Sequence, residues 1–430
     1  HEAAMLQAAF DRTLNGSLEL VDVHGYSGIG KSCFVNELQK PVTLHDGYFL
    51  RGKYDLLNSK AYSAIADAFS ILVSQILSDP CESTITKWKN EIISAIGLNN
   101  CQLLCDIIPE LEKIVGDVLN MTQAAATSAV ELENRLKYSF TQFVQLISGK
   151  GKSIVLFIDD LQWADIASLN LLKTIMAIPS LKHFMLIVSY RENEVGELHP
   201  AMQALHTIRE NESIQTTLIS LKPLTENSLN QLIADILHTS DQNACADLAH
   251  AVFTKTDGNP FFVKLFLQTL YDQKLVWFDA RKRAWQWNMA TIQALHATEN
   301  VIQFMAGRIE SLPNDCKAVM ANASCIGNTF SDFKISLIME KNKSWIKQAV
   351  EHAIQSKMIM VTQQYNATEF CNMELYRFSH DKIQEASYNL LSEAEKREAH
   401  WQFGRKLLVG IQLHAHSNDH TDLFEAVNHL

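Results

Sequence analysis

The segment Gly25–Ser32 contains residue types at a spacing that suits the binding of a phosphate group. It has the sequence Gly-Tyr-Ser-Gly-Ile-Gly-Lys-Ser, fits the pattern G-x-x-x-x-G-K-[ST], and directly follows the apolar run 18–23. Its three glycines allow positive φ angles and bring backbone N–H groups close to phosphate oxygens. The helix expected to begin at Lys31 adds a partial positive charge at its N-terminus. The pattern therefore predicts a strand, a loop and a helix that bind a nucleoside triphosphate.

Each part of this loop has an expected role toward a triphosphate and its metal ion. Lys31 is predicted to bridge the terminal phosphates, and the Ser32 hydroxyl is predicted to bind Mg²⁺. The other contacts to the nucleotide are expected from Gly25, Ser27, Gly28, Ile29, Gly30 and Cys33. The alternative is a glycine turn without a ligand, which requires the strand and the helix to flank it by chance.

Two acidic residues, Asp159 and Asp160, follow the apolar run 153–158. Such an uninterrupted run is typical of a parallel strand buried on both faces, and open α/β sheets bind ligands at the carboxyl edge. Asp159 is predicted to hold Mg²⁺, usually through water, because this cation prefers oxygen ligands. Asp160 is predicted to orient or polarise the water that attacks the γ-phosphate.

A basic residue, Arg191, follows the apolar run 184–190. A planar and permanently charged guanidinium at this edge suits contact with the γ-phosphate, and Arg191 is predicted to report the loss of that phosphate. The alternative is a salt bridge at the edge of the sheet with Glu192 or Glu194.

The elements that position these residues follow from the spacing of apolar side chains. Helices alternate with the predicted strands, which indicates an α/β doubly wound core with a parallel sheet. The strands are expected at 18–23, 48–54, 153–158, 184–190 and 216–219. Helical spacing between 61 and 148 predicts a helical insertion in residues 56–150. Asp165 is expected to cap a helix at 166–177, and Trp163 is expected to pack.

The strand pattern ends at Pro223. Helices are expected at 224–238, at 244–255 and from Pro260, because proline suits the first helical turn. Short strands at 275–278 and 284–287 predict a β-hairpin whose aromatic residues pack. The remainder shows helices and then short strands near 358–362 and 375–379, an order compatible with a winged-helix domain.

Composition restricts the class of partner. The chain has 37 basic and 48 acidic residues, a net charge of −11, and no basic run longer than Arg281–Arg283, which argues against a nucleic-acid motor. Its 8 cysteines form no C-x-x-C pair, which fits a reduced cytoplasmic compartment. No signal peptide and no apolar run of membrane-spanning length is present. The chain begins and stops inside helical patterns, at residues 5–14 and 422–430, and is expected to be a segment of a larger protein.

Four segments in this order resemble the ATPase domain of the STAND class, within the AAA-like P-loop proteins. They are Gly25–Ser32, Ile158–Asp165, Tyr190–Val195 and Gly258–Phe262. The segments 52–55, 325–330 and 378–384 are similar to those of large signalling proteins. Such proteins join a serine/threonine kinase-like domain, this ATPase, a GAF domain and a sensor histidine kinase. The resemblance covers essentially the whole chain.

The resemblance implies roles for the second half of the chain. Gly258 and Pro260 are expected to lie in a helical lid and to contact the base and sugar. His380 stands where some relatives have a histidine near the β-phosphate, although capping of a helix at 380–390 is an equal alternative. The expected domains are a P-loop core (1–222), a lid (223–297), a winged-helix-like domain that folds over the nucleotide (298–391) and the start of a further helical region (392–430).

These observations predict a module that binds ATP or ADP with Mg²⁺, hydrolyses ATP slowly and acts as a switch for attached signalling domains. The parent protein is expected to be a sensor histidine kinase or a serine/threonine kinase, and a homo-oligomer is one expected active form. Three alternatives stay open: a DNA-directed ATPase, the ATPase module of a transcription regulator, and, least favoured, a small-molecule P-loop kinase.

Overall fold

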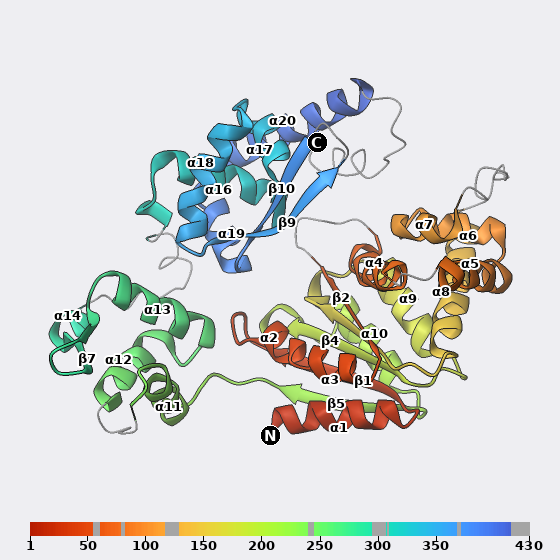
Figure 1. The fold of residues 1–430 in the computed structure, drawn as a ribbon, viewed down its shortest axis with the longest axis horizontal. Coiled ribbons are helices and arrows are strands. Elements are labelled where there is room, and N and C mark those ends of the chain that lie inside the picture. Colours follow the sequence, from red (N-terminus) through yellow and green to blue (C-terminus); the bar gives the residue numbers. More distant parts are fainter. Residues whose placement is uncertain are drawn as a thin grey trace. The chain divides into compact units, whose positions relative to one another are not determined.

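The computed structural model describes residues 1–54, 61–78, 82–116, 129–239, 245–294, 307, 309–367 and 371–413. These residues fall into two compact units, which divide between Lys222 and Pro223 (Figure 1). Each unit has its own sheets and its own hydrophobic clusters. The helical pattern at 422–430 and the expected boundary at 297/298 lie outside the described residues.

The first unit contains a five-stranded parallel sheet with the order β2-β3-β4-β1-β5. The α/β parallel sheet predicted from the sequence is thereby confirmed, with β5 longer than the predicted 216–219. Strand β4 lies between the strand that leads into the glycine loop and the strand that ends in the acid pair. The strands are β1 (Leu18–Gly25), β2 (Tyr48–Lys53), β3 (Ile154–Asp159), β4 (Phe184–Arg191) and β5 (Ile214–Ser220).

Helices cover both faces of this sheet (Figure 1). One face packs on α1 (Glu2–Leu14), α2 (Lys31–Asn36) and α3 (Gln39–Leu44). The other face packs on α9 (Ile166–Met176), α10 (Pro200–Arg209) and helices of an insertion between β2 and β3. The insertion comprises α4 (Ser63–Leu77), α5 (Glu82–Ile96), α6 (Leu98–Cys105), α7 (Glu112–Val115) and α8 (Ala129–Ser148).

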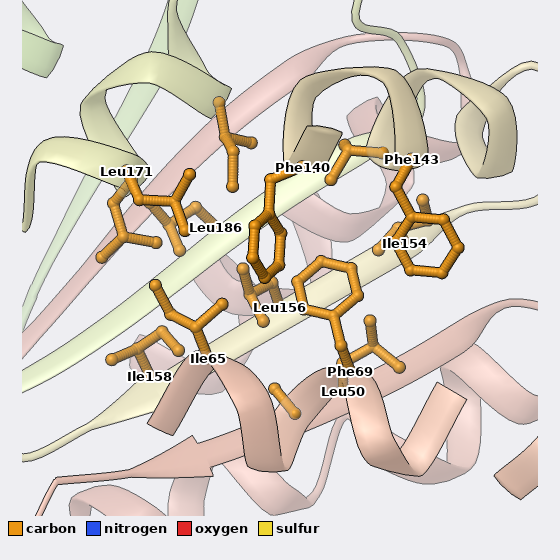
Figure 2. Packing of buried hydrophobic residues seen from close by; sticks show 14 of the residues in the cluster. Leu50, Ile65, Phe69, Phe140, Phe143, Ile154, Leu156, Ile158, Leu171 and Leu186 are labelled. Carbon is orange, nitrogen blue, oxygen red and sulfur yellow. The ribbon is translucent and has the colours of Figure 1, made fainter. Parts of the chain in front are cut away.

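The surroundings of strand β3 explain why apolar and polar residues do not alternate in its sequence. Ile154, Leu156 and Ile158 point toward the insertion, where Figure 2 shows Phe69 of α4 and Phe140 of α8. The rings of Phe69 and Phe140 meet edge to face, with centroids 5.6 Å apart. The intervening side chains of β3 join the cluster on the opposite face of the sheet. Because both faces are covered, each position in this strand is buried and apolar up to the acidic end.

Gly52 of β2 contacts the insertion closely. A Cβ atom at position 52 would lie 1.7 Å from the carbonyl oxygen of Ala64, near the start of α4. Gly52→Ala is therefore expected to force the strand and helix apart and to lower the free energy of unfolding of the first unit by about 3 kcal/mol. Urea unfolding followed by circular dichroism measures this change.

Gly196 provides the matched control for this substitution. A Cβ atom there would have no neighbour within 4 Å, and its φ angle is not positive. Gly196→Ala is expected to change the free energy of unfolding by less than about 0.5 kcal/mol. Similar effects of the two substitutions would contradict the proposed close contact at Gly52.

The second unit begins with a helical region and a hairpin. The strands β6 (Val276–Asp279) and β7 (Ala284–Trp287) pair in antiparallel fashion, so the predicted β-hairpin is confirmed. Buried apolar residues of β6 and of four helices form one cluster, and Trp285 and Trp287 of β7 pack against it. The helices are α11 (Glu226–Ile236), α12 (Ala246–Thr256), α13 (Pro260–Asp272) and α14 (Met289–Ala294).

The remainder of the second unit surrounds a three-stranded antiparallel sheet with the order β8-β10-β9. In chain order a helix, a strand, two helices and two strands follow one another. That order agrees with the winged-helix prediction, which stays a prediction. The elements are α16 (Asn314–Ile326), β8 (Thr329–Ser331), α17 (Asp332–Met339), α18 (Lys343–Gln355), β9 (Ile359–Ala367), β10 (Cys371–Phe378), α19 (Asp381–Tyr388) and α20 (Glu393–Leu413).

Candidate nucleotide site

The glycine loop connects β1 to α2, as the sequence predicts. Gly25, Gly28 and Gly30 have φ angles of 153°, 80° and 98°. Residues with a Cβ atom rarely adopt these backbone conformations. At Gly25 a Cβ atom would also lie 2.6 Å from the carbonyl oxygen of Leu221. The loop therefore depends on glycine both for its backbone conformation and for its contact with the segment that follows β5.

Lys31 begins α2 and points back toward the loop. Its side chain is buried, and Nζ donates hydrogen bonds to the carbonyl oxygens of Gly25 at 2.9 Å and Tyr26 at 3.0 Å. Burial lowers the pKa of the Lys31 ammonium, and the nearby carboxylate of Asp160 opposes this effect. The side chain thus places a cation under the loop, where a bound phosphate would meet it.

The two predicted Mg²⁺ ligands lie in contact. The Ser32 hydroxyl donates to Asp159 Oδ2 at 2.5 Å, and the Ser189 hydroxyl of β4 donates to Asp159 Oδ1. Arg51 Nη2 lies 3.4 Å from Asp159 Oδ2. Within the described ranges no group of three histidine, cysteine or acidic side chains is arranged to hold a metal. A Mg²⁺ ion here would therefore combine these two oxygen donors with phosphate and water oxygens, and this donor set fits the ion.

The Asp160 carboxylate contacts Lys53, Arg191 and Gln162. Its Oδ2 lies 3.0 Å from Lys53 Nζ, and its Oδ1 lies 3.5 Å from Arg191 Nε. The Gln162 amide donates to Asp160 Oδ1 at 2.9 Å and accepts a hydrogen bond from the Arg191 backbone N–H. The Asp160 backbone is in the left-handed region, with φ 55°. That conformation is uncommon for aspartate, and it turns the chain sharply as β3 ends.

Arg191 forms an ion pair with Glu194. This is the salt bridge expected as the alternative to a phosphate contact. Arg191 Nη1 lies 2.7 Å from Glu194 Oε1, while its guanidinium carbon stands 4.5 Å from the centre of the Trp163 ring. Trp163 thus packs on Arg191, and Asp165 caps α9 by accepting from the Ser168 N–H, as expected. The structure brings Arg191, Asp160 and Lys31 to one edge of the sheet, and the γ-phosphate contact of Arg191 stays a prediction.

Sequence reasoning did not assign Arg51, Lys53, Gln162 and Ser189 to the site. Arg51 and Lys53 share a feature that the sequence does show: both are basic residues near the end of a predicted strand. Lys53 pairs in register with Asp159, because β2 runs parallel to β3. The residues of β2, a strand at the edge of the sheet, do not indicate which strand lies next to it. The strand order of the sheet is therefore needed to place these two cations beside the acid pair.

The predicted lid residues and His380 lie in the second unit. Gly258 has a φ of 68°, and a Cβ atom there would lie 2.1 Å from the carbonyl oxygen of Leu224. Asn259 caps α13, which begins at Pro260. His380 caps α19 by accepting from the Lys382 N–H, so the helix-capping alternative for His380 is confirmed. Its ring also stacks on Phe261, with centroids 3.9 Å apart, which brings His380 next to the Gly258–Phe261 segment.

A charged cluster lies at the end of β1, directly before the loop. Asp22 is fully buried and forms an ion pair with Arg209, and the Tyr190 hydroxyl lies 3.3 Å from Asp22 Oδ2. His24 Nδ1 lies 3.5 Å from Asp22 Oδ1, at the outer limit of a hydrogen bond. Asp22 is the main cause that raises the pKa of His24 above its usual value.

His24→Asn is expected to remove a pH-dependent part of the stability. The pKa of His24 is higher in the folded than in the unfolded chain, so its stabilising effect is fully present below about pH 6.5. It is lost as the pH rises through the folded-state pKa. Urea unfolding of both proteins from pH 5.5 to 8.5 measures the difference. His206→Asn, at an exposed side chain of α10, is the control, and a constant difference across this range would contradict the role of His24.

Comparison with known proteins shows which classes of protein this chain resembles. Residues 1–188 match the family model of the AAA ATPase domain. A hybrid signal transduction histidine kinase G of Dictyostelium discoideum is 28% identical over 92% of this chain and 14% of its own length. A peroxide stress-activated histidine kinase, mak3, of Schizosaccharomyces pombe is 22% identical over 88% of this chain and 17% of its own length.

Solved structures of low similarity were also found. A STAND protein with a tetratricopeptide repeat sensor from Pyrococcus horikoshii has 12% identity and a TM-score of 0.49, over 98% of this chain and 46% of its own. The Aeropyrum pernix ORC1 protein, solved with DNA, has 13% identity and a TM-score of 0.35, over 90% of this chain and 92% of its own.

Residues 1–188 are thus similar to the AAA ATPase domain, and the parallel sheet and the glycine loop of the first unit have the arrangement of a P-loop nucleotide-binding fold. The predicted resemblance to this class, found in signalling proteins, is confirmed. This chain spans about one seventh of the first curated relative and about one sixth of the second. No described helix has the length and apolar character needed to cross a membrane.

Proposed function

We propose that this chain is an ATP-binding regulatory module of the STAND kind, which hydrolyses ATP slowly within a larger signal-transduction protein. The observation that carries the proposal is the contact between Ser32 and Asp159, two oxygen donors 127 residues apart that meet beside Lys31. The AAA ATPase family match and the names of the two curated relatives support it.

Binding of the triphosphate follows from the loop. Backbone N–H groups of Gly28 and Gly30, the N-terminus of α2 and Lys31 Nζ provide positive charge for the phosphates. Lys31 exchanges its two carbonyl partners for phosphate oxygens. Ser32 and Asp159 hold Mg²⁺, which neutralises charge on the phosphates when it is bound.

Hydrolysis is assigned to Asp160. Its carboxylate accepts a hydrogen bond from the attacking water and orients it toward the γ-phosphate. Lys53 and Gln162 fix the carboxylate, because each contacts one of its oxygens. Lys53 and Arg191 pair with the same carboxylate, so they compete with the attacking water for its oxygens, and this competition is proposed to slow turnover.

Arg191 supplies the switch in this proposal. It contacts Asp160 and Glu194, and a γ-phosphate at the sheet edge competes with both for the guanidinium. ADP lacks that phosphate, so ATP and ADP favour different positions of Arg191. Gly258 and Pro260 contact the base and sugar, and His380 is proposed to approach the phosphates, which makes the second unit responsive to the nucleotide.

The proposal for the whole protein follows the relatives. The parent protein is proposed to be a cytoplasmic sensor histidine or serine/threonine kinase whose attached domains receive the conformational signal. Assembly into a homo-oligomer on activation is part of the same proposal.

ATP turnover in the presence and absence of DNA tests the function. A regulatory switch is expected to show the same turnover with duplex or single-stranded DNA, since the chain has a net charge of −11. The Lys31→Ala variant establishes which part of the measured turnover belongs to this chain. Stimulation by DNA of about tenfold or more would overturn the proposal in favour of a DNA-directed ATPase.

A further inference from the structure

The second unit contains a cavity of its own. Its volume is about 510 Å³, and we name it the α11–α13 groove after the two helices that line most of it. Nine of its 13 lining residues are aliphatic, two are Tyr271 and Trp285, and the remaining two are Lys264 and Gln268. This size and composition are typical of sites that bind small, mainly apolar molecules.

The groove follows from the spacing of residues on two helices. On α13 the lining positions are 260, 263, 264, 267, 268 and 271, which form one helical stripe. On α11 they are 232, 233 and 236, and Leu237 follows the last residue of this helix. Leu248 of α12 and Val276 and Trp285 of the hairpin complete the lining. The stripe on α13 is about 16 Å long, so the lining extends along that helix.

Several apolar side chains of the groove stay exposed. Leu232, Ile236 and Tyr271 are 37%, 51% and 57% exposed, although their neighbours Ile233, Val263 and Leu270 are buried in the cluster of the same helices. Exposed apolar residues that gather around one cavity indicate a binding surface rather than a random surface distribution.

One charge stands in this apolar lining. Lys264 is the single charged residue among the lining residues, and its ammonium forms no ion pair within the described ranges. Gln268, one turn further along α13, donates its amide hydrogen to Asp272 Oδ1 at 2.9 Å. A compact ammonium at the rim of an apolar groove that extends along α13 complements an anionic head group on an apolar chain.

From this charge and shape we propose that the α11–α13 groove binds a linear aliphatic carboxylate. The alkyl chain lies along the stripe of α13 against Val263 and Leu267, and the carboxylate accepts hydrogen bonds from Lys264 Nζ. The proposal does not require a bound nucleotide, and it shares one residue, Pro260, with the nucleotide contacts proposed above.

Calorimetric titration of the whole chain with decanoate and with decylamine, which is cationic at neutral pH, tests the proposal below the micellar concentrations of both. The unmodified chain is expected to bind one decanoate, roughly fivefold more tightly than decylammonium. Lys264→Glu is expected to reverse this preference, and Lys264→Met to make the two affinities similar. Because Lys264 is exposed, these variants are expected to fold normally.

A second variant separates the groove from other apolar surface. Leu267→Trp fills the groove and is expected to weaken both ligands at least tenfold, with the fold checked by circular dichroism. Ile71→Trp, at an exposed apolar side chain of α4, is the matched control and is expected to leave binding unchanged.

Three results would overturn the proposal. They are the absence of saturable decanoate binding, an unchanged preference in Lys264→Glu, and unchanged binding in a folded Leu267→Trp variant. Capture of an amphipathic peptide probe by a groove that ignores decanoate would assign the groove to a protein helix instead, and would also overturn it.

Discussion

Lys31→Ala is expected to abolish measurable ATP binding, a loss of at least about 100-fold in affinity. The side chain is buried and its ammonium already lies within hydrogen-bond distance of the loop carbonyls. Its removal leaves the phosphates without the ammonium beside the loop carbonyls and opens a space that water must fill. Titration calorimetry with MgATP measures the effect directly.

A second lysine variant makes this result specific. Lys40→Ala, on the exposed side of α3, removes a cation of the same unit without touching the loop, and it is expected to bind ATP normally. Thermal unfolding shows whether Lys31→Ala remains folded. Unchanged ATP affinity in a folded Lys31→Ala protein would remove the basis for placing the phosphates at Gly25–Ser32.

Asp160→Asn is expected to preserve ATP binding and to lower kcat by about 100- to 1,000-fold. The amide keeps the size of the side chain, but it is a weaker acceptor for the attacking water. It also loses the ion pairs with Lys53 and Arg191. Single-turnover hydrolysis of ATP gives the rate, and titration of the same protein gives the affinity.

The matched control is Asp11→Asn on the exposed face of α1, which is expected to change neither quantity. An Asp159→Asn variant distinguishes the two acids, because it is expected to weaken the Mg²⁺ dependence of binding instead. Normal turnover by Asp160→Asn would exclude this residue as the acceptor and leave the role to another group at the edge of the sheet.

The conformation of the loop was predictable because its signal is local. Three glycines with positive φ and a lysine at the start of a helix occur within eight residues, so their spacing determines the geometry. The acid pair was predictable for a related reason. An uninterrupted apolar strand must be buried on both faces, and polar residues directly after it must emerge at the edge.

The surroundings of the acid pair were not predictable from spacing. Lys53 lies 107 residues before Asp160 in sequence, and the contact exists because β2 is the neighbour of β3. The order of strands depends on how the whole insertion packs on the sheet. Likewise, the ring contact between Phe261 and His380 joins two elements 119 residues apart, and no periodicity in either segment contains that information.

The position of β4 between β1 and β3 constrains how this site can respond to its ligand. Two strand spacings, about 9.6 Å, separate the strand before the loop from the strand before the acids. Continuous backbone hydrogen bonds fix that distance, so hydrolysis cannot be accompanied by opening or closing of the sheet itself. In the proposed switch, rotamers of long side chains at the edge would then register the difference between two nucleotides, on a frame that stays the same.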